Sequence, residues 1–151
     1  MSPQQVSRDT GTRRFALLRL ANIALLLPLH EVQSLESVED IDTGRRLPGS
    51  AGAMRRADSW LKVFCLSDNL EPQPELPAAF RMCAILATGN TLVGLACHAI
   101  SSLDDVALTH HPLPTSMRAA PSPVLALASE GEQVYCRTTV ADLVLFLERI
   151  A

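Results

Sequence analysis

Short turn sequences between apolar segments constrain the fold of this chain more than any other feature. Gly89-Asn90, Glu130-Gly131 and the weaker Ala21-Asn22 are each flanked on both sides by apolar residues. Glycine tolerates the positive φ that a tight two-residue hairpin turn needs. The pattern therefore predicts a small, mainly β protein that is built from antiparallel hairpins.

We expect three hairpins and one further strand. The hairpins join residues 14–20 to 23–27, 80–88 to 91–98, and 124–128 to 133–137, and the further strand covers 60–66. Both arms of the first hairpin are apolar at nearly every position, so it is buried on both faces, or buried on one and offered to a partner on the other. In the strand, alternation places Trp60, Lys62, Phe64 and Leu66 on one face and Leu61, Val63 and Cys65 on the other.

The remaining segments are predicted as connections and one helix. Residues 29–33 suit a short helical turn before an extended segment at 34–38, and 39–58 and 104–123 have the turn chemistry of long loops. Thr139 is a good helix N-cap, and Asp142 follows at the spacing of a capping box. Apolar residues then recur at helical spacing up to Ile150, which predicts a C-terminal helix packed on the sheets.

Composition sets the class of protein and its compartment. A chain of 151 residues with 48% hydrophobic residues suits one globular domain, which we place at 14–151 after a flexible tail at 1–13. The net charge of −3 argues against nucleic-acid binding. Residues 82–103 carry no charge and are long enough to span a membrane, but a turn at their centre favours a hairpin. We therefore expect a soluble, cytoplasmic protein.

The cysteine and histidine residues give no strong sign of a cofactor site. The four cysteines lack the close spacing of a zinc site, which favours buried thiols in a reducing compartment. Cys83 and Cys97 lie on opposite arms of one predicted hairpin, so a disulfide is geometrically open to them. A metal at His110-His111 has no further ligand nearby, and a solvated loop is the better interpretation. We predict neither a metal nor another cofactor.

The order of the segments along the chain is itself a recognisable pattern. A hairpin at 15–28 is followed by the short helix with Val32, and then by Leu47-Pro48 and Gly52. The strand at 62–66, the hairpin arm at 93–95, and a last hairpin with a helix at 124–151 complete the pattern. In this order the segments resemble the CheW-like coupling domains of bacterial chemotaxis. The likeness covers nearly all of residues 14–150 and depends on element order and apolar pattern.

This resemblance implies both a fold and a function. It implies two packed five-stranded SH3-like barrels with a C-terminal helix, forming one domain of two intertwined sub-barrels. It implies a non-enzymatic adaptor that joins a chemoreceptor's cytoplasmic tip to the regulatory domain of a histidine kinase through apolar grooves. Exposed apolar surface of this kind marks protein-binding sites. The candidate protein-binding residues are Val38, Met54, Arg56, Trp60, Val93 and Leu95.

The chain departs from the family pattern at one pair of positions. Family members carry Arg-Gly where Ala57-Asp58 stand here, and the arginine tends to pair with a glutamate at the position of Ser34. On this alignment both members of the pair are missing, as expected of a divergent family member that either serves a specialised chemosensory system or lacks the usual receptor coupling. Losing both partners costs less than losing one, because no buried charge is left alone.

Two other classes of function are also compatible with the sequence. The first is a small β-barrel enzyme or ligand carrier that uses Cys97, His98 or His110, and it requires a thiol with a lowered pKa. The second is a degenerate structural subunit that forms a homodimer through the uncharged hairpin at 82–98.

Overall fold

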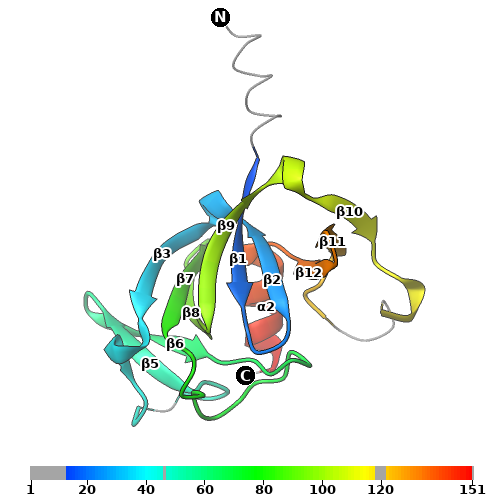
Figure 1. Cartoon of the computed structure of the whole chain (residues 1–151). Coiled ribbons are helices and arrows are strands. Elements are labelled where there is room, and N and C mark those ends of the chain that lie inside the picture. The colour runs from blue at the N-terminus through cyan, green and yellow to red at the C-terminus, as the bar shows by residue number, and fades with distance from the viewer. Residues whose placement is uncertain (1–12, 46, 118–121, 151) are drawn as a thin grey trace, which may run out of the picture.

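The described part of the chain is mainly β, as predicted, and ends in one α-helix (Figure 1). A computed structural model describes residues 13–45, 47–117 and 122–150, so most of the predicted tail lies outside the described residues. The strands are β1 (Arg14–Arg19), β2 (Ala24–Pro28), β3 (Val32–Ser37), β4 (Ile41–Asp42), β5 (Gly52–Arg56), β6 (Ser59–Phe64), β7 (Met82–Thr88), β8 (Thr91–Cys97), β9 (Ala99–Asp104), β10 (Thr109–Pro112), β11 (Ala126–Glu130) and β12 (Gln133–Arg137). The 3-10 turns are η1 (Leu29–Glu31), η2 (Val38–Asp40), η3 (Asp105–Ala107) and η4 (Thr115–Met117), and the helix is α2 (Val140–Ile150).

Two six-stranded sheets share one topology. Sheet A has the order β10-β11-β12-β2-β1-β9, and sheet B has the order β4-β5-β6-β8-β7-β3. Each sheet contains one parallel pair at the same place, β12 with β2 and β6 with β8. Sheet B uses consecutive strands, whereas sheet A combines the four strands from β9 to β12 with the N-terminal hairpin. The first hairpin of the chain therefore completes the sheet that the C-terminal half begins.

A 3-10 turn joins the two edge strands of each sheet. The chain passes from β3 through η2 into β4, and from β9 through η3 into β10, and the two halves lie at opposite edges. A strand that bends in this way connects both edges of its sheet, as the long strand of a small barrel does. The five strands expected per barrel and the six observed per sheet thus describe the same topology. The bent strand counts as one strand in the first number and as two strands in the second.

Side-chain alternation along the strands produces three apolar cores. Core A lies within sheet A, core B lies within sheet B, and a shared core lies between the sheets and α2. Core A contains Phe15, Leu17, Ala24, Leu26, Ala128 and Tyr135. Core B contains Ile41, Ala51, Met54, Leu61, Val63, Cys65, Phe80, Cys83, Ile85 and Ala96. The shared core contains Ala16, Leu18, Leu20, Leu25, Leu27, Phe64, Leu66, Ala84, Leu86, Val93, Leu95, Cys97, Val140, Leu143, Val144 and Leu147.

The three cores explain the two segments that are apolar throughout. In β1, Phe15 and Leu17 enter core A while Ala16 enters the shared core, so the first hairpin is buried on both faces. The β7–β8 hairpin accounts for the uncharged segment at 82–103 in the same way, since Ile85 enters core B and Leu86 the shared core. Gly89 forms its tip at φ 55°. The chain itself therefore covers the hairpin that one alternative assigned to a dimer interface.

The two predicted loops were partly wrong, because they contain strands. Residues 39–58 include β4 and β5, residues 104–123 include β10, and β9 precedes the second loop. The β5–β6 turn is Ala57-Asp58, which lacks the glycine that marks a tight turn, although Ala57 adopts a positive φ of 51°. Strand β10 is exposed along its whole length, so it shows no apolar alternation.

The C-terminal helix begins where its capping residues predict. The Thr139 hydroxyl accepts a hydrogen bond from the Asp142 backbone N–H at 3.1 Å and donates one to the Asp142 carboxylate at 2.6 Å. Val140, Leu143 and Leu147 are buried in the shared core. The helix thus closes the space between the two sheets, as the apolar stripe predicts.

Strand register also settles the cysteine question. Cys83 pairs with Ala96 and Cys97 with Met82, an offset of one residue. Because successive residues face opposite sides, the Cys83 side chain lies in core B and that of Cys97 in the shared core. All four cysteines are free, so the disulfide between Cys83 and Cys97 that the hairpin left open does not form.

Candidate functional site

Three of the six predicted protein-binding residues lie inside the cores. Met54 is 3% exposed in core B, and Val93 and Leu95 are 2% and 0% exposed in the shared core. Their side chains cannot touch a partner directly in this conformation. As core residues, they pack beneath the residues that form the surface.

The other three predicted residues are half-buried and lie in sheet B or in the turn between two of its strands. Val38 lies in η2, where its backbone N–H donates to the Arg81 carbonyl at 3.2 Å. Arg56 ends β5, and Trp60 lies at the start of β6. The accessible part of the predicted set therefore gathers around η2 and the β5–β6 hairpin.

An acid–arginine pair connects the edge strand β3 to β5. The Arg56 Nη1 lies 3.0 Å from the Glu36 Oε2, and the two side chains are 32% and 27% exposed. The Ser34 hydroxyl donates to the same carboxylate oxygen at 3.2 Å. Because Glu36 pairs with Cys83 across the sheet, its carboxylate faces the core B side, where an unpaired charge is unfavourable.

This pair corrects the interpretation that the chain lacks both charged partners. The family alignment points to Ser34 and Ala57, but the pair forms between Glu36, two residues later, and Arg56, one residue earlier. Alternation along β3 gives no signal for the pair, because it would turn the apolar Leu35 inward, whereas Leu35 is exposed and Ser34 and Glu36 are half-buried. A glutamate on the inward face of an edge strand requires a cation nearby.

Two arginines flank the only tryptophan of the chain. The guanidinium carbon of Arg45 lies 4.1 Å from the Trp60 ring centroid, and that of Arg55 lies 5.7 Å away. Arg55 is the direct cross-strand neighbour of Trp60, whereas Arg45 comes from the segment after β4. Sequence reasoning selected Trp60 as a recognition residue but missed both arginines.

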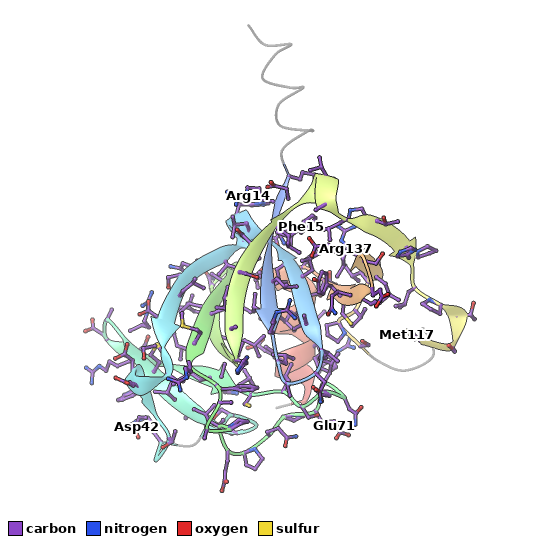
Figure 2. The ribbon with its side chains drawn as sticks, viewed as in Figure 1. Arg14, Phe15, Asp42, Glu71, Met117 and Arg137 are labelled. Carbon is purple, nitrogen blue, oxygen red and sulfur yellow. The ribbon has the colours of Figure 1, made fainter. Side chains whose placement is uncertain are left out.

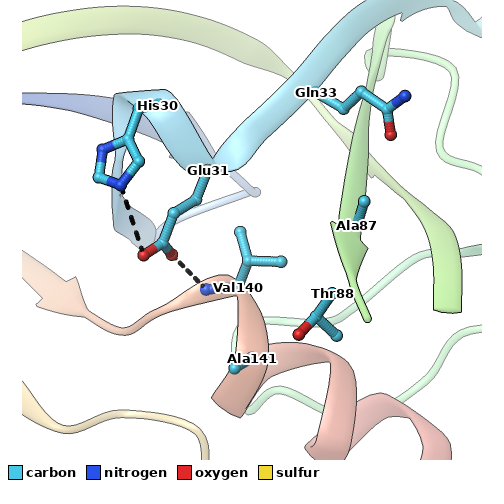
Figure 3. A pocket seen from close by; sticks show the side chains of 7 residues that line it. All are labelled: His30, Glu31, Gln33, Ala87, Thr88, Val140 and Ala141. Atoms are coloured by element: carbon cyan, nitrogen blue, oxygen red, sulfur yellow. Dashed lines mark hydrogen bonds and ion pairs between the residues drawn. The ribbon is translucent and has the colours of Figure 1, made fainter. Parts of the chain in front are cut away.

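A pocket of about 410 Å³ lies where sheet B meets the start of α2 (Figure 3). We call it the junction pocket; its lining residues are His30, Glu31, Gln33, Ala87, Thr88, Val140 and Ala141. The Glu31 Oε1 accepts a hydrogen bond from the Val140 backbone N–H at 2.9 Å, and its Oε2 lies 4.0 Å from the His30 Nε2. This carboxylate satisfies a free N–H of the helix terminus and fixes the helix against η1.

The residues of the enzyme alternative do not form one site. Cys97 is fully buried in the shared core, and burial raises the pKa of its thiol, opposite to the lowered value that the alternative requires. His98 follows Cys97 in the chain and is exposed. His110 lies on β10, at the edge of sheet A. No described element brings the three side chains together.

His110 instead takes part in a polar cluster over core A. Its Nε2 lies 2.6 Å from the Asp105 Oδ1, and its Nδ1 lies 3.1 Å from the Arg137 Nη1. Because a guanidinium can only donate, Nδ1 accepts and the Nε2–H is donated to Asp105. The guanidinium carbons of Arg13 and Arg137 lie 5.4 and 5.2 Å from the Phe15 ring centroid, and Figure 2 shows Phe15 and Arg137 close together.

The described residues contain no group of three or more side chains that could hold a metal ion. The neighbouring His111 is hydrogen-bonded to the Ser129 hydroxyl at 3.0 Å, and both histidines lie in a strand where a solvated loop was expected. In the described ranges, no helix is long and apolar enough to cross a membrane.

Comparison with known proteins identifies the fold. No protein-family model and no curated protein matches the sequence. The structure is similar to the crystal structure of the scaffolding protein TtCheW from Thermoanaerobacter tengcongensis, with a TM-score of 0.62 and 13% sequence identity. The match covers 84% of this chain and 88% of that chain. The three-dimensional comparison thus agrees with the resemblance in element order, and the chain has the CheW-like fold.

Proposed function

We propose that this chain is a non-enzymatic adaptor in chemotaxis-type signal transduction, coupling chemoreceptors to a sensor histidine kinase. The observation that carries the proposal is the similarity in fold to the scaffolding protein TtCheW over 84% of the chain. The resemblance in sequence supplies the expected partners, which are the regulatory domain of the kinase and the cytoplasmic tip of the receptor. Partners of this kind would place the adaptor in the cytoplasm.

Two neighbouring features of sheet B support docking of a protein partner. The junction pocket is a concave surface that combines the Ala87 methyl with polar groups of Gln33 and Thr88. Leu35, two residues along β3 from Gln33, is 48% exposed. Concave surface beside an exposed leucine suits an apolar side chain of a partner. We propose that the junction pocket and Leu35 form the main docking surface, which continues around the edge strand β3 to the accessible Val38 and Arg56 on its core B side.

Filling the pocket tests this proposal. The full chain is mixed with the kinase regulatory domain and with a receptor cytoplasmic fragment from the same organism, and binding is measured by gel filtration and calorimetry. We expect a complex that Ala87→Tyr weakens by at least about tenfold, because a bulky ring occupies the space that the partner needs. Ala107→Tyr places the same ring on the exposed η3 and is expected to bind as the wild type does.

One result would count against the adaptor and another against its docking surface. The first is the absence of a complex with every kinase and receptor of that organism. The second is an equal loss of binding in both tyrosine variants, which would mean that the junction pocket has no special role.

A further inference from the structure

The surface around Trp60 has the composition of a binding site for acidic groups. The Arg45 and Arg55 guanidinium carbons lie 4.1 and 5.7 Å from its ring centroid, and both arginine residues are exposed. Tryptophan and arginine are the residue types most enriched at the energetic centres of protein interfaces. We call this surface the Trp60 face.

Neither arginine has an acidic partner in the part of the chain that the structure describes. The ion pairs formed there use Arg14, Arg56, His30 and His110. The Nε of Arg55 donates to the Ala57 carbonyl at 3.4 Å, which restrains the side chain and leaves its terminal nitrogens available. Two exposed guanidinium groups thus lie close together with no carboxylate bound to either.

Stacking on the indole prepares the arginines for a ligand. A guanidinium that lies over an aromatic ring keeps its N–H donors in the guanidinium plane, where they can bind a carboxylate in bidentate geometry. The stacked side chain has already lost rotamer freedom, so less entropy is lost when a partner binds. Lys62, on the same face two residues along β6, adds a third positive charge.

We propose that the Trp60 face docks an acidic segment of a partner protein. Neighbouring carboxylates of the segment bind Arg45 and Arg55, and an apolar side chain beside them packs on the indole. This goes beyond the adaptor role, since it assigns a second binding surface with a different chemistry from the junction pocket. It holds whichever partner occupies that pocket.

Charge favours an acidic protein segment over nucleic acid as the occupant. The chain has a net charge of −3, and the Trp60 face offers Arg45, Arg55 and Lys62 as its cations. Nucleic acid binds through many phosphate contacts spread along a basic surface, and three cations on one face are too few for such contacts. A short segment with a few adjacent carboxylates matches a small cationic face on such a chain.

The chain contains a built-in probe for this proposal, because Trp60 is its only tryptophan. The full chain is titrated with a blocked peptide of repeated Glu-Asp-Leu triplets, and Trp60 emission and heat of binding are recorded. We expect saturable binding that weakens with added salt, and no binding of the matching Gln-Asn-Leu peptide.

A pair of charge-matched variants locates the contact. The double variant Arg45→Gln/Arg55→Gln is expected to lower the association constant roughly tenfold or more, because both proposed contacts are removed. The control Arg81→Gln/Arg149→Gln removes two other exposed arginines and should leave binding unchanged. Calorimetry measures the affinity in both, since the first variant also changes the surroundings of the indole.

Three results would overturn the proposal: no saturable binding by the wild type, an equal loss in both double variants, or a Trp60 response to single-stranded DNA or phosphatidylserine vesicles but not to the peptide. Complex formation with the kinase and receptor fragments is measured on the same variants. If the Trp60 face fails while those complexes persist, the adaptor proposal survives. If peptide binding persists without those complexes, the Trp60 face stands without the adaptor.

Discussion

Sheets A and B share one strand topology but differ in what fills them. Core B contains ten buried residues, all apolar, whereas core A contains six and is covered at one end by Arg13 and Arg137, which lie over Phe15. The parallel strand pairs show the same contrast. Their inward residues are Val63 and Gly94 in sheet B, but Leu26 and Arg137 in sheet A. Strand order and turns therefore set the topology, while the size of the core and the charged groups beside it differ. The Glu36–Arg56 pair faces the core B side, and two arginines lie over Phe15 in core A.

This contrast predicts unequal costs when the same volume of hydrocarbon is removed from each core. Ile85→Ala in core B and Leu17→Ala in core A should each lower the free energy of unfolding by about 2–5 kcal/mol. We expect the Ile85 change to cost more, because core B is the larger cluster and its buried apolar side chains surround most of the cavity. In core A, Arg13 and Arg137 lie over Phe15 at one end, so their side chains and water can move toward the cavity. Urea unfolding of the two variants measures the difference, and a larger cost for Leu17→Ala would contradict it.

Substitutions in equivalent hairpin turns of the two sheets should give the next largest change in stability. The β5–β6 turn has Ala57 at φ 51°, and the β11–β12 turn has Gly131 at φ 61°. An L-residue is strained in this region and glycine is not, so Ala57→Gly should stabilise the protein by about 1 kcal/mol. Gly131→Ala should destabilise it by about the same amount. A Cβ there would meet nothing within 4 Å, so the cost comes from the backbone alone.

Thermal unfolding of both turn variants tests this expectation. Gly44→Ala is the control, because an added Cβ would make only an ordinary contact of 3.4 Å with the Asp42 carboxylate, and the φ of Gly44 is not in the strained region. Destabilisation by Gly44→Ala equal to that by Gly131→Ala, or no gain in stability from Ala57→Gly, would contradict the role of the positive φ.

The same two turns show how far local sequence can reveal the fold. The turn at Gly89 and the cap at Thr139 lie where the sequence predicts them, since each depends on residues close in the chain. The predicted turn at 130–131 shifts by one residue, to Gly131-Glu132. The Ala57-Asp58 turn was missed because its strain is compensated by the fold and not by residue choice. Strand β10 was missed because none of its residues is buried.

Non-local features of the site were harder to predict for a different reason. The Glu36–Arg56 pair joins strands that are not sequence neighbours, and family register pointed to other positions for it. Arg45 reaches Trp60 from a loop that carries no periodic pattern. Insertion of the first hairpin between β12 and β9 likewise depends on pairing across most of the chain, which no local pattern encodes.

Ion pairs extend the comparison between the sheets to smaller effects. In sheet B the Glu36 and Arg56 side chains are 27% and 32% exposed, whereas in sheet A Arg14 and Asp104 are 54% and 59% exposed at 3.1 Å. Double-mutant cycles with Gln and Asn substitutions should give a coupling energy of about 1 kcal/mol for the first pair. The second should fall near zero, since water screens exposed charges. Equal coupling energies in the two cycles would mean that burial does not distinguish the pairs.

Ionisation of the buried thiols has the smallest effect on the free energy of unfolding at neutral pH. The effect grows in alkaline solution. Burial raises the pKa of Cys65 to about 11 and, with the Glu36 charge as a second cause, that of Cys83 to about 12, from an ordinary 9.0. The folded state thus favours the neutral thiols. This stabilisation is complete below pH 9 and declines as the pH rises toward 11 and 12.

Urea unfolding across this alkaline range should show the decline in the wild type and a weaker one in Cys83→Ala. The rates at which the thiols react with iodoacetamide also distinguish the two sheets. Cys136, half-buried in sheet A, should react first, and the three fully buried thiols only as the chain opens. Cys136→Ser should remove the fast phase alone. Simultaneous labelling of all four thiols would instead mean that both sheets open as one unit, and the contrast between their interiors would then have no counterpart in their local stability.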